Sequence, residues 1–130
     1  MSRKVLVVED EPSIRNLIYV LLRALKCEGE VAYNDQQALA MVSRGAFDAV
    51  LLDLRCSDAS PEEVVSRIHA MRPNLVGRIL CITSEVSDAT TMNMIESNCL
   101  PYVRRGQLMN DLWDRLRVVF SQPQGLPSTR

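Results

Sequence analysis

The chain lacks the features that would place it in a membrane, outside the cell or on a polyanion. Its 130 residues carry 15 Lys and Arg against 16 Asp and Glu, so there is no basic excess to hold nucleic acid or anionic lipid. No apolar run approaches the roughly 20 residues that a membrane-spanning helix needs. The residues after Met1 lack the longer apolar stretch and small-residue cleavage site of a secretory signal. We therefore expect a cytoplasmic protein with no membrane contact and no direct nucleic-acid binding by this chain.

Cysteine and histidine are too sparse for a zinc motif. The four cysteines contain no CxxC pair, and the sequence has only one histidine, His69. We interpret the cysteines as reduced thiols, at least two of them packed in the interior. His69 falls on the polar side of an expected helix, where we expect it to be exposed.

Short apolar runs alternate with stretches of helical periodicity. Three runs rich in Val, Ile and Leu, at residues 5–8, 49–52 and 79–82, have the continuous apolar character of buried parallel strands. Behind Pro12, apolar residues at positions 14, 17, 18, 21, 22 and 25 follow the spacing of one helix face. The capping box SPEE at residues 60–63 begins another helix, and apolar positions between 108 and 119 predict the last one. Weaker patterns predict strands around 30–33 and 102–103, and helices over 35–44 and 88–97.

These elements give a strand-helix unit repeated five times. Parallel neighbours joined by right-handed helical crossovers must carry helices on both faces of the sheet. We therefore predict an α/β fold of the flavodoxin-like type, a doubly wound, five-stranded parallel sheet with strand order 2-1-3-4-5. Residues 1–121 form this one domain, and residues 122–130, rich in Pro and polar residues, are expected to be a flexible tail or a truncated linker.

In a doubly wound sheet, ligands bind beyond the carboxyl ends of the strands where the strand order reverses. The first strand ends in the acidic residues 9–11, and the third ends in Asp53. Two like charges about 4 Å apart cost on the order of 4 kcal/mol at an effective dielectric near 20, so the cluster favours a cation such as Mg²⁺. Thr83 and Ser84 end the fourth strand. Carboxylates, a divalent cation and a hydroxyl suit phosphoryl transfer onto a carboxylate, while Glu11 is better interpreted as a helix N-terminal charge.

Four segments carry a more specific pattern: VLVVEDEP at residues 5–12, DAVLLDLR at 48–55, ILCITS at 79–84 and PYVRR at 101–105. With them, the sequence resembles the response-regulator receiver domains of two-component signalling over residues 3 to about 121. The resemblance implies a phosphorelay domain that accepts a phosphoryl group from a sensor histidine kinase or a phosphotransfer protein and switches a surface for an output partner or domain. It implies no enzymatic activity beyond the domain's own phosphorylation and dephosphorylation.

The resemblance also assigns roles to individual residues. Asp53 matches the phosphoacceptor, and Mg²⁺ would be held by Glu9, Asp10, Asp53 and the backbone carbonyl of Arg55. Thr83 matches the switch hydroxyl, Tyr102 the aromatic switch, Arg105 the phosphate-facing cation and Glu85 a variable position two residues after the threonine.

The sequence departs from the family at Arg105-Gly106, where receivers usually have Lys-Pro, and in the loop after Asp53. A cis peptide before a residue other than proline costs about 2.5 to 4 kcal/mol, so we predict a trans Arg105–Gly106 peptide. We expect the re-routed loop to point Arg105 away from Asp53, towards solvent or Glu85. These departures support an alternative, a degenerate receiver that works as a phosphorylation-independent interaction module. A flavodoxin-like nucleotide enzyme is disfavoured because no glycine-rich phosphate loop follows the first strand.

Overall fold

The structure is a computed structural model that describes residues 2–56, 59–84 and 88–121. Ser57, Glu85 and the expected tail at 122–130 lie outside these described residues. None of the described helices is long and apolar enough to cross a membrane.

Five parallel strands form one sheet in the order β2-β1-β3-β4-β5, as predicted. The strands are β1 (Arg3–Val8), β2 (Cys27–Ala32), β3 (Ala49–Asp53), β4 (Ile79–Thr83) and β5 (Tyr102–Arg104). The helices between them are α1 (Pro12–Ala24), α2 (Asp35–Arg44), α3 (Pro61–Met71), α4 (Ala89–Ser97) and α5 (Leu108–Phe120). Short 3-10 turns follow β3 at Leu54–Cys56 (η1), α3 at Pro73–Leu75 (η2) and β5 at Arg105–Gln107 (η3).

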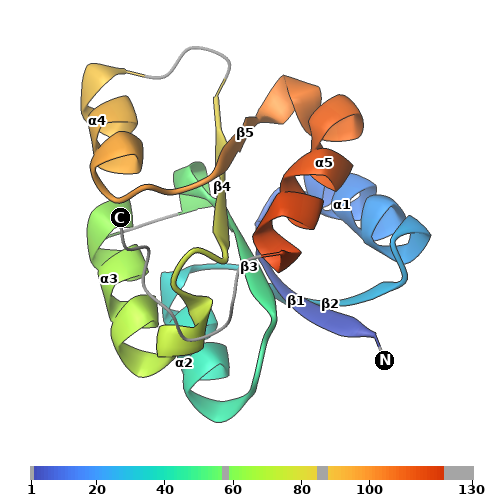
Figure 1. Ribbon diagram of the computed structural model, residues 1–130, viewed down its shortest axis with the longest axis horizontal. Coiled ribbons are helices and arrows are strands. Elements are labelled where there is room, and N and C mark those ends of the chain that lie inside the picture. The colour runs from blue at the N-terminus through green and yellow to red at the C-terminus, as the bar shows by residue number, and fades with distance from the viewer. Residues whose placement is uncertain (1, 57–58, 85–87, 122–130) are drawn as a thin grey trace.

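The sheet separates two apolar cores, because alternate side chains of a strand point to opposite faces. Leu6, Val50 and Leu52 pack in the core that α2 and α3 cover, and Leu51 and Ile82 pack in the core under α1 and α5. Figure 1 shows the α1–α5 pair on one side of the sheet and α2 and α3 on the other. All five residues of β3 and all five of β4 are buried, which explains their continuous apolar sequences.

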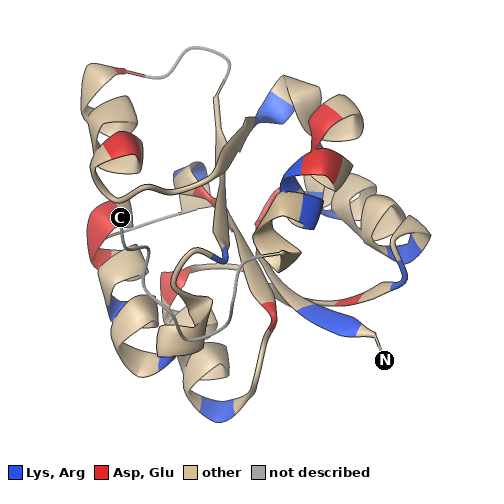
Figure 2. Ribbon diagram, viewed as in Figure 1, with Lys and Arg blue, Asp and Glu red and all other residues tan. Residues whose placement is uncertain are grey.

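Three helices begin where a polar side chain caps the first turn. Ser60 accepts a hydrogen bond from the Glu63 amide at 3.1 Å, as the predicted capping box requires. Asn34 and Asp88 cap α2 and α4 in the same way. In the view of Figure 2, acidic and basic residues are interspersed over the helices, consistent with the balanced charge.

Two local expectations need correction. The second strand begins at Cys27, earlier than the expected 30–33, because it pairs along the whole length of β1. Its sequence gave a weak signal, since it is a half-polar edge strand whose Gly29 lies under Tyr19; a Cβ there would come within 2.9 Å of that ring. His69 is half-buried rather than exposed, and burial lowers its pKa.

Candidate functional site

Acidic residues meet at the carboxyl ends of β1 and β3, as predicted from the strand order. Val8 pairs with Leu52, so the next residues, Glu9 and Asp53, lie side by side at the sheet edge. Both side chains are completely buried, whereas Asp10 is exposed. Ionised carboxylates are rarely buried without compensation, so this pair requires an opposing charge or a proton.

The two oxygens of Asp53 have different surroundings. Oδ1 accepts hydrogen bonds from the Arg55 amide at 2.9 Å and from Nη2 of Arg105 at 2.8 Å. Oδ2 is buried and has no hydrogen-bond partner among the described residues. The carboxylate is therefore held and neutralised through one oxygen, and the other oxygen is left for a ligand or a reaction.

The position of Arg105 corrects one prediction and confirms another. The Arg105–Gly106 peptide is trans, as expected, with no cis peptide among the described residues. The expectation that Arg105 points away from Asp53 is wrong, since the guanidinium is mostly buried and forms an ion pair with Asp53. Thr83 pairs with Arg104, so Arg105 begins η3 one residue beyond the strand ends, and its long side chain reaches the buried carboxylate. The desolvated charge of Asp53 favours this contact over solvent.

Arg55 forms a second link across the site. Its amide holds Asp53, while its half-exposed guanidinium pairs with Glu11 at 2.7 Å. That pairing lowers the pKa of Glu11 from its usual value. Glu11 also donates its amide to Glu9 at 3.2 Å, so it supports the acidic pair in addition to standing at the start of α1.

Burial, together with the neighbouring Asp53, raises the pKa of Glu9 to about 8. In the unfolded chain this carboxyl would have its ordinary value, so the folded protein binds the proton more tightly. Its contribution to stability is present below about pH 4.5 and is lost as the pH rises towards about 8.

We expect Glu9→Gln to increase the free energy of unfolding of the metal-free protein by about 1 to 3 kcal/mol at pH 8.5 and much less at pH 4.5, because glutamine avoids the buried charge. Urea unfolding at the two pH values measures the difference. Glu96→Gln, on the exposed surface of α4, is the matched control. A gain for Glu9→Gln that is equal at both pH values would contradict this explanation.

Cys56 is the member of the site that sequence reasoning missed. Its Sγ accepts the Asp10 amide at 3.3 Å and lies 3.3 Å from Oδ1 of Asp10 and 3.8 Å from Oε2 of Glu9. The thiol is buried because η1 turns the chain back towards β1 directly after Asp53. Burial raises its pKa strongly. Its only sequence signal was its position three residues after Asp53; Cys81 is buried in the core as expected.

Thr83 lies at the end of β4, buried, with no partner for Oγ1 among the described residues. Beside it is a hollow of about 240 Å³ whose lining includes Arg55, Thr83, Ser84 and Arg105. Tyr102 is half-buried on β5 and packs against the core under α2 and α3. Thr83 and Arg105 therefore line one hollow, and Arg105 links it to the buried Asp53 through their ion pair. The switch roles of Thr83 and Tyr102 stay predictions.

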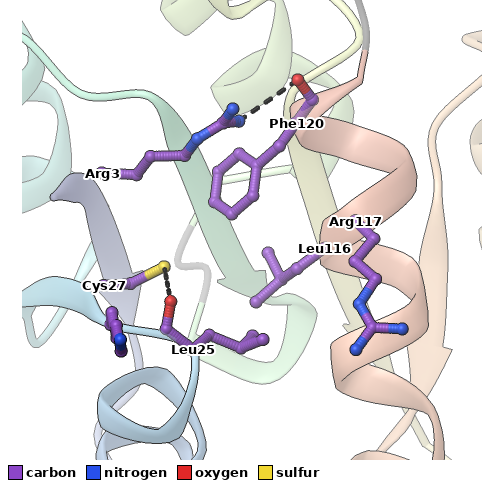
Figure 3. Close-up of a pocket in the computed structure, with 7 residues that line it drawn as sticks. Arg3, Leu25, Cys27, Leu116, Arg117 and Phe120 are labelled. Atoms are coloured by element: carbon purple, nitrogen blue, oxygen red, sulfur yellow. Dashed lines mark hydrogen bonds between the residues drawn. The ribbon is translucent and has the colours of Figure 1, made fainter. Parts of the chain in front are cut away.

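A second hollow, of about 190 Å³, lies at the other end of the sheet (Figure 3). Arg3 and Cys27, the first residues of β1 and β2, line it together with α5. Arg3 donates to the Phe120 carbonyl at 3.2 Å and stacks over the Phe120 ring. Its cation is engaged in closing the domain, and the other charged residues in the lining, Lys26 and Arg117, are basic as well.

The fold and the acidic site together define a signalling receiver. Residues 5–117 match the family model described as the response regulator receiver domain, so the chain belongs to that family.

The similarity extends to curated relatives and solved structures. The response regulator protein PilR of Pseudomonas aeruginosa is 30% identical over 106 residues, covering 81% of this chain and 23% of PilR. The transcriptional regulatory protein ZraR of Klebsiella oxytoca is 30% identical over 119 residues, covering 91% of this chain and 25% of ZraR. The chain thus spans about a quarter of the length of these relatives.

Two solved receiver domains have the same fold. A CheY-like receiver domain protein from Methanospirillum hungatei JF-1 is 18% identical, with a TM-score of 0.74 over 92% of this chain and 97% of the other. The receiver domain of the sensor histidine kinase PA1611 from P. aeruginosa, solved with a magnesium ion in its active site cleft, is 21% identical, with a TM-score of 0.73 over 93% of this chain and all of that domain.

Proposed function

We propose that this chain is a phosphoacceptor receiver in which Oδ2 of Asp53 attacks a phosphoryl group carried by a sensor histidine kinase or a phosphotransfer protein. The single observation that carries the proposal is the asymmetry of Asp53, held through Oδ1 and buried but unpartnered at Oδ2. A nucleophile must be fixed in place while its attacking atom stays free. A cytoplasmic location is part of this proposal.

The residues at the site fit Mg²⁺, a hard cation that prefers oxygen ligands. Oε1 of Glu9 and Oδ2 of Asp53 are both buried without partners among the described residues, and the exposed Asp10 adds a third carboxylate. We assign the metal to Glu9, Asp10, Asp53 and the backbone carbonyl of Arg55. Mg²⁺ in the cleft of the PA1611 receiver supports this assignment. The ion would neutralise the charge that gathers during phosphoryl transfer.

The remaining residues stabilise and report the phosphorylated state. Arg105 neutralises Asp53 before transfer, and its second guanidinium nitrogen is available to a phosphoryl oxygen in the adjoining hollow. Thr83 has an uncommitted hydroxyl at the same hollow and would donate to that oxygen. Movement of Thr83 would let Tyr102 turn inward and change the surface of α4 and β5, which an output partner or domain reads.

A second candidate, a phosphorylation-independent interaction module, is favoured by the same ion pair. Arg105 already neutralises Asp53 without a phosphoryl group or a metal ion, so the charge of this carboxylate is compensated within the domain. In that case the output partner would recognise the surface of α4 and β5 in the unphosphorylated protein.

Beryllofluoride, a phosphoryl analogue, separates the two candidates. With Mg²⁺ present, we expect saturable NMR shifts of the amides of Thr83 and α4, and we expect Asp53→Asn to remove them. Asp114→Asn, an exposed carboxylate on α5, is the matched control and should keep them. Unchanged spectra of the wild-type protein at saturating beryllofluoride and Mg²⁺ would support the interaction module instead.

A further inference from the structure

We propose that the same pocket also binds a thiophilic divalent cation of the Zn²⁺ or Co²⁺ class, with the Cys56 thiolate as a ligand beside the carboxylates of Glu9 and Asp53. This extends the metal part of the proposed function and rests on that part only, since it does not require Asp53 to be phosphorylated. A hard cation such as Mg²⁺ binds only the oxygen atoms of the site. A thiolate ligand from Cys56 would instead favour a softer divalent cation.

The distances among the side chains fit such a cation. Ligand atoms from Glu9, Asp53 and Cys56 all lie within 4.8 Å of one another. A tetrahedral metal with bonds of about 2.3 Å to sulfur and about 2.0 Å to oxygen would hold these atoms roughly 3.5 Å apart. Sγ of Cys56 lies 3.8 Å from Oε2 of Glu9 and 3.3 Å from Oδ1 of Asp10. Small side-chain movements are therefore enough to bring sulfur and oxygen onto one ion.

A second, independent observation concerns two carboxylate oxygens of the pocket. Oε1 of Glu9 and Oδ2 of Asp53 are completely buried and receive no hydrogen bond from an amide, guanidinium or hydroxyl group of the described residues. The two carboxyl groups can share only a proton with each other. Buried carboxylate oxygens in this condition are costly unless a cation or a proton reaches them. Arg105 compensates only Oδ1 of Asp53, so it leaves the oxygen that a metal needs.

The coordination step balances without a redox partner. The Cys56 thiol loses one proton to solvent as the metal-sulfur bond forms, protonated Glu9 loses its proton to solvent as its oxygen binds, and the cation keeps its oxidation state. Zn²⁺ and Co²⁺ bind thiolate far better than Mg²⁺ does, and the nearby oxygens suit both. A cation held this way would occupy the place of Mg²⁺ at Asp53. It would therefore compete with Mg²⁺ and hinder the phosphorylation that needs Mg²⁺.

The absorption spectrum of bound Co²⁺ tests the thiolate ligand directly. The full chain is kept reduced with a reductant that contains no metal. We expect Co²⁺ to produce a thiolate-to-cobalt charge-transfer band in the near ultraviolet, which Zn²⁺ removes by displacement. Cys56→Ser and Cys56→Ala should abolish the band, and Cys56→Ser should weaken Co²⁺ binding at least about tenfold. Cys99→Ser, which changes an exposed thiol, is the matched control and should keep the band.

A wild-type protein that binds Co²⁺ without the band would overturn the proposal, as would a band that survives in the Cys56 variants or disappears in Cys99→Ser. Zinc X-ray absorption on the wild-type protein answers the same question without any variant. A shell with one sulfur at about 2.3 Å supports the site, and a shell of nitrogen and oxygen alone contradicts it. Either negative result leaves magnesium binding and phosphorylation of Asp53 open to their own tests.

Discussion

Replacing Arg105 by methionine is expected to lower the free energy of unfolding of the metal-free protein by about 3 kcal/mol, because the change leaves a buried carboxylate without its counter-charge. Asp53 is completely buried, and the guanidinium of Arg105 is its one ion-pair partner within 3 Å among the described residues. Methionine keeps much of the apolar stem of arginine, so the loss reports the charge more than the packing. Urea unfolding at neutral pH with a chelator present measures it.

Combining Arg105→Met with Asp53→Asn isolates the contribution of the Arg105–Asp53 ion pair. In the Asp53→Asn background, Arg105→Met should cost less than about 1 kcal/mol, since no charge is left to compensate. Arg117→Met is the surface control, because its exposed pair with Asp114 at 3.8 Å contributes little. An equal cost of Arg105→Met in both backgrounds would show that the arginine acts through packing and not through Asp53.

The second large effect concerns the metal. Asp10→Ala is expected to abolish Mg²⁺ binding, which in the wild-type protein should lie around the millimolar range of an open carboxylate site. Asp10 is exposed, so its removal should leave the fold intact while depriving the cation of a carboxylate next to Glu9 and Asp53. Isothermal titration calorimetry measures the change. Asp114→Ala should bind Mg²⁺ as the wild-type protein does; equal affinity in Asp10→Ala would show that the assigned pocket is wrong.

The sequence predicts the sheet well because burial dictates its pattern. The strands β3 and β4 are apolar up to their last residues, Asp53 and Thr83, since helices cover both faces of the sheet, and the strand order then brings Glu9 and Asp53 together. The edge strand β2 carries Glu28, Gly29 and Glu30, and its alternation is too weak to set its start.

Two features of the site depend on backbone paths that sequence periodicity does not encode. The direction of Arg105 depends on how η3 leaves β5, and the loop argument was right about the trans peptide but wrong about the side chain. Neither of the expected directions, towards solvent or towards Glu85, gives the buried Asp53 the counter-charge that it requires. Cys56 reaches the acidic pair only because η1 turns back towards β1, and a single cysteine gives no pattern that predicts such a turn.

The central claim is that Asp53 accepts a phosphoryl group with the help of Mg²⁺. Intact-mass spectrometry of the wild-type protein after incubation with a small acyl phosphate tests it most directly. The account predicts one labile, base-sensitive phosphoryl group per chain, formed only with Mg²⁺ present and absent from Asp53→Asn. A wild-type protein that gains no phosphoryl group with Mg²⁺, or an Asp53→Asn variant that gains one, would contradict the account.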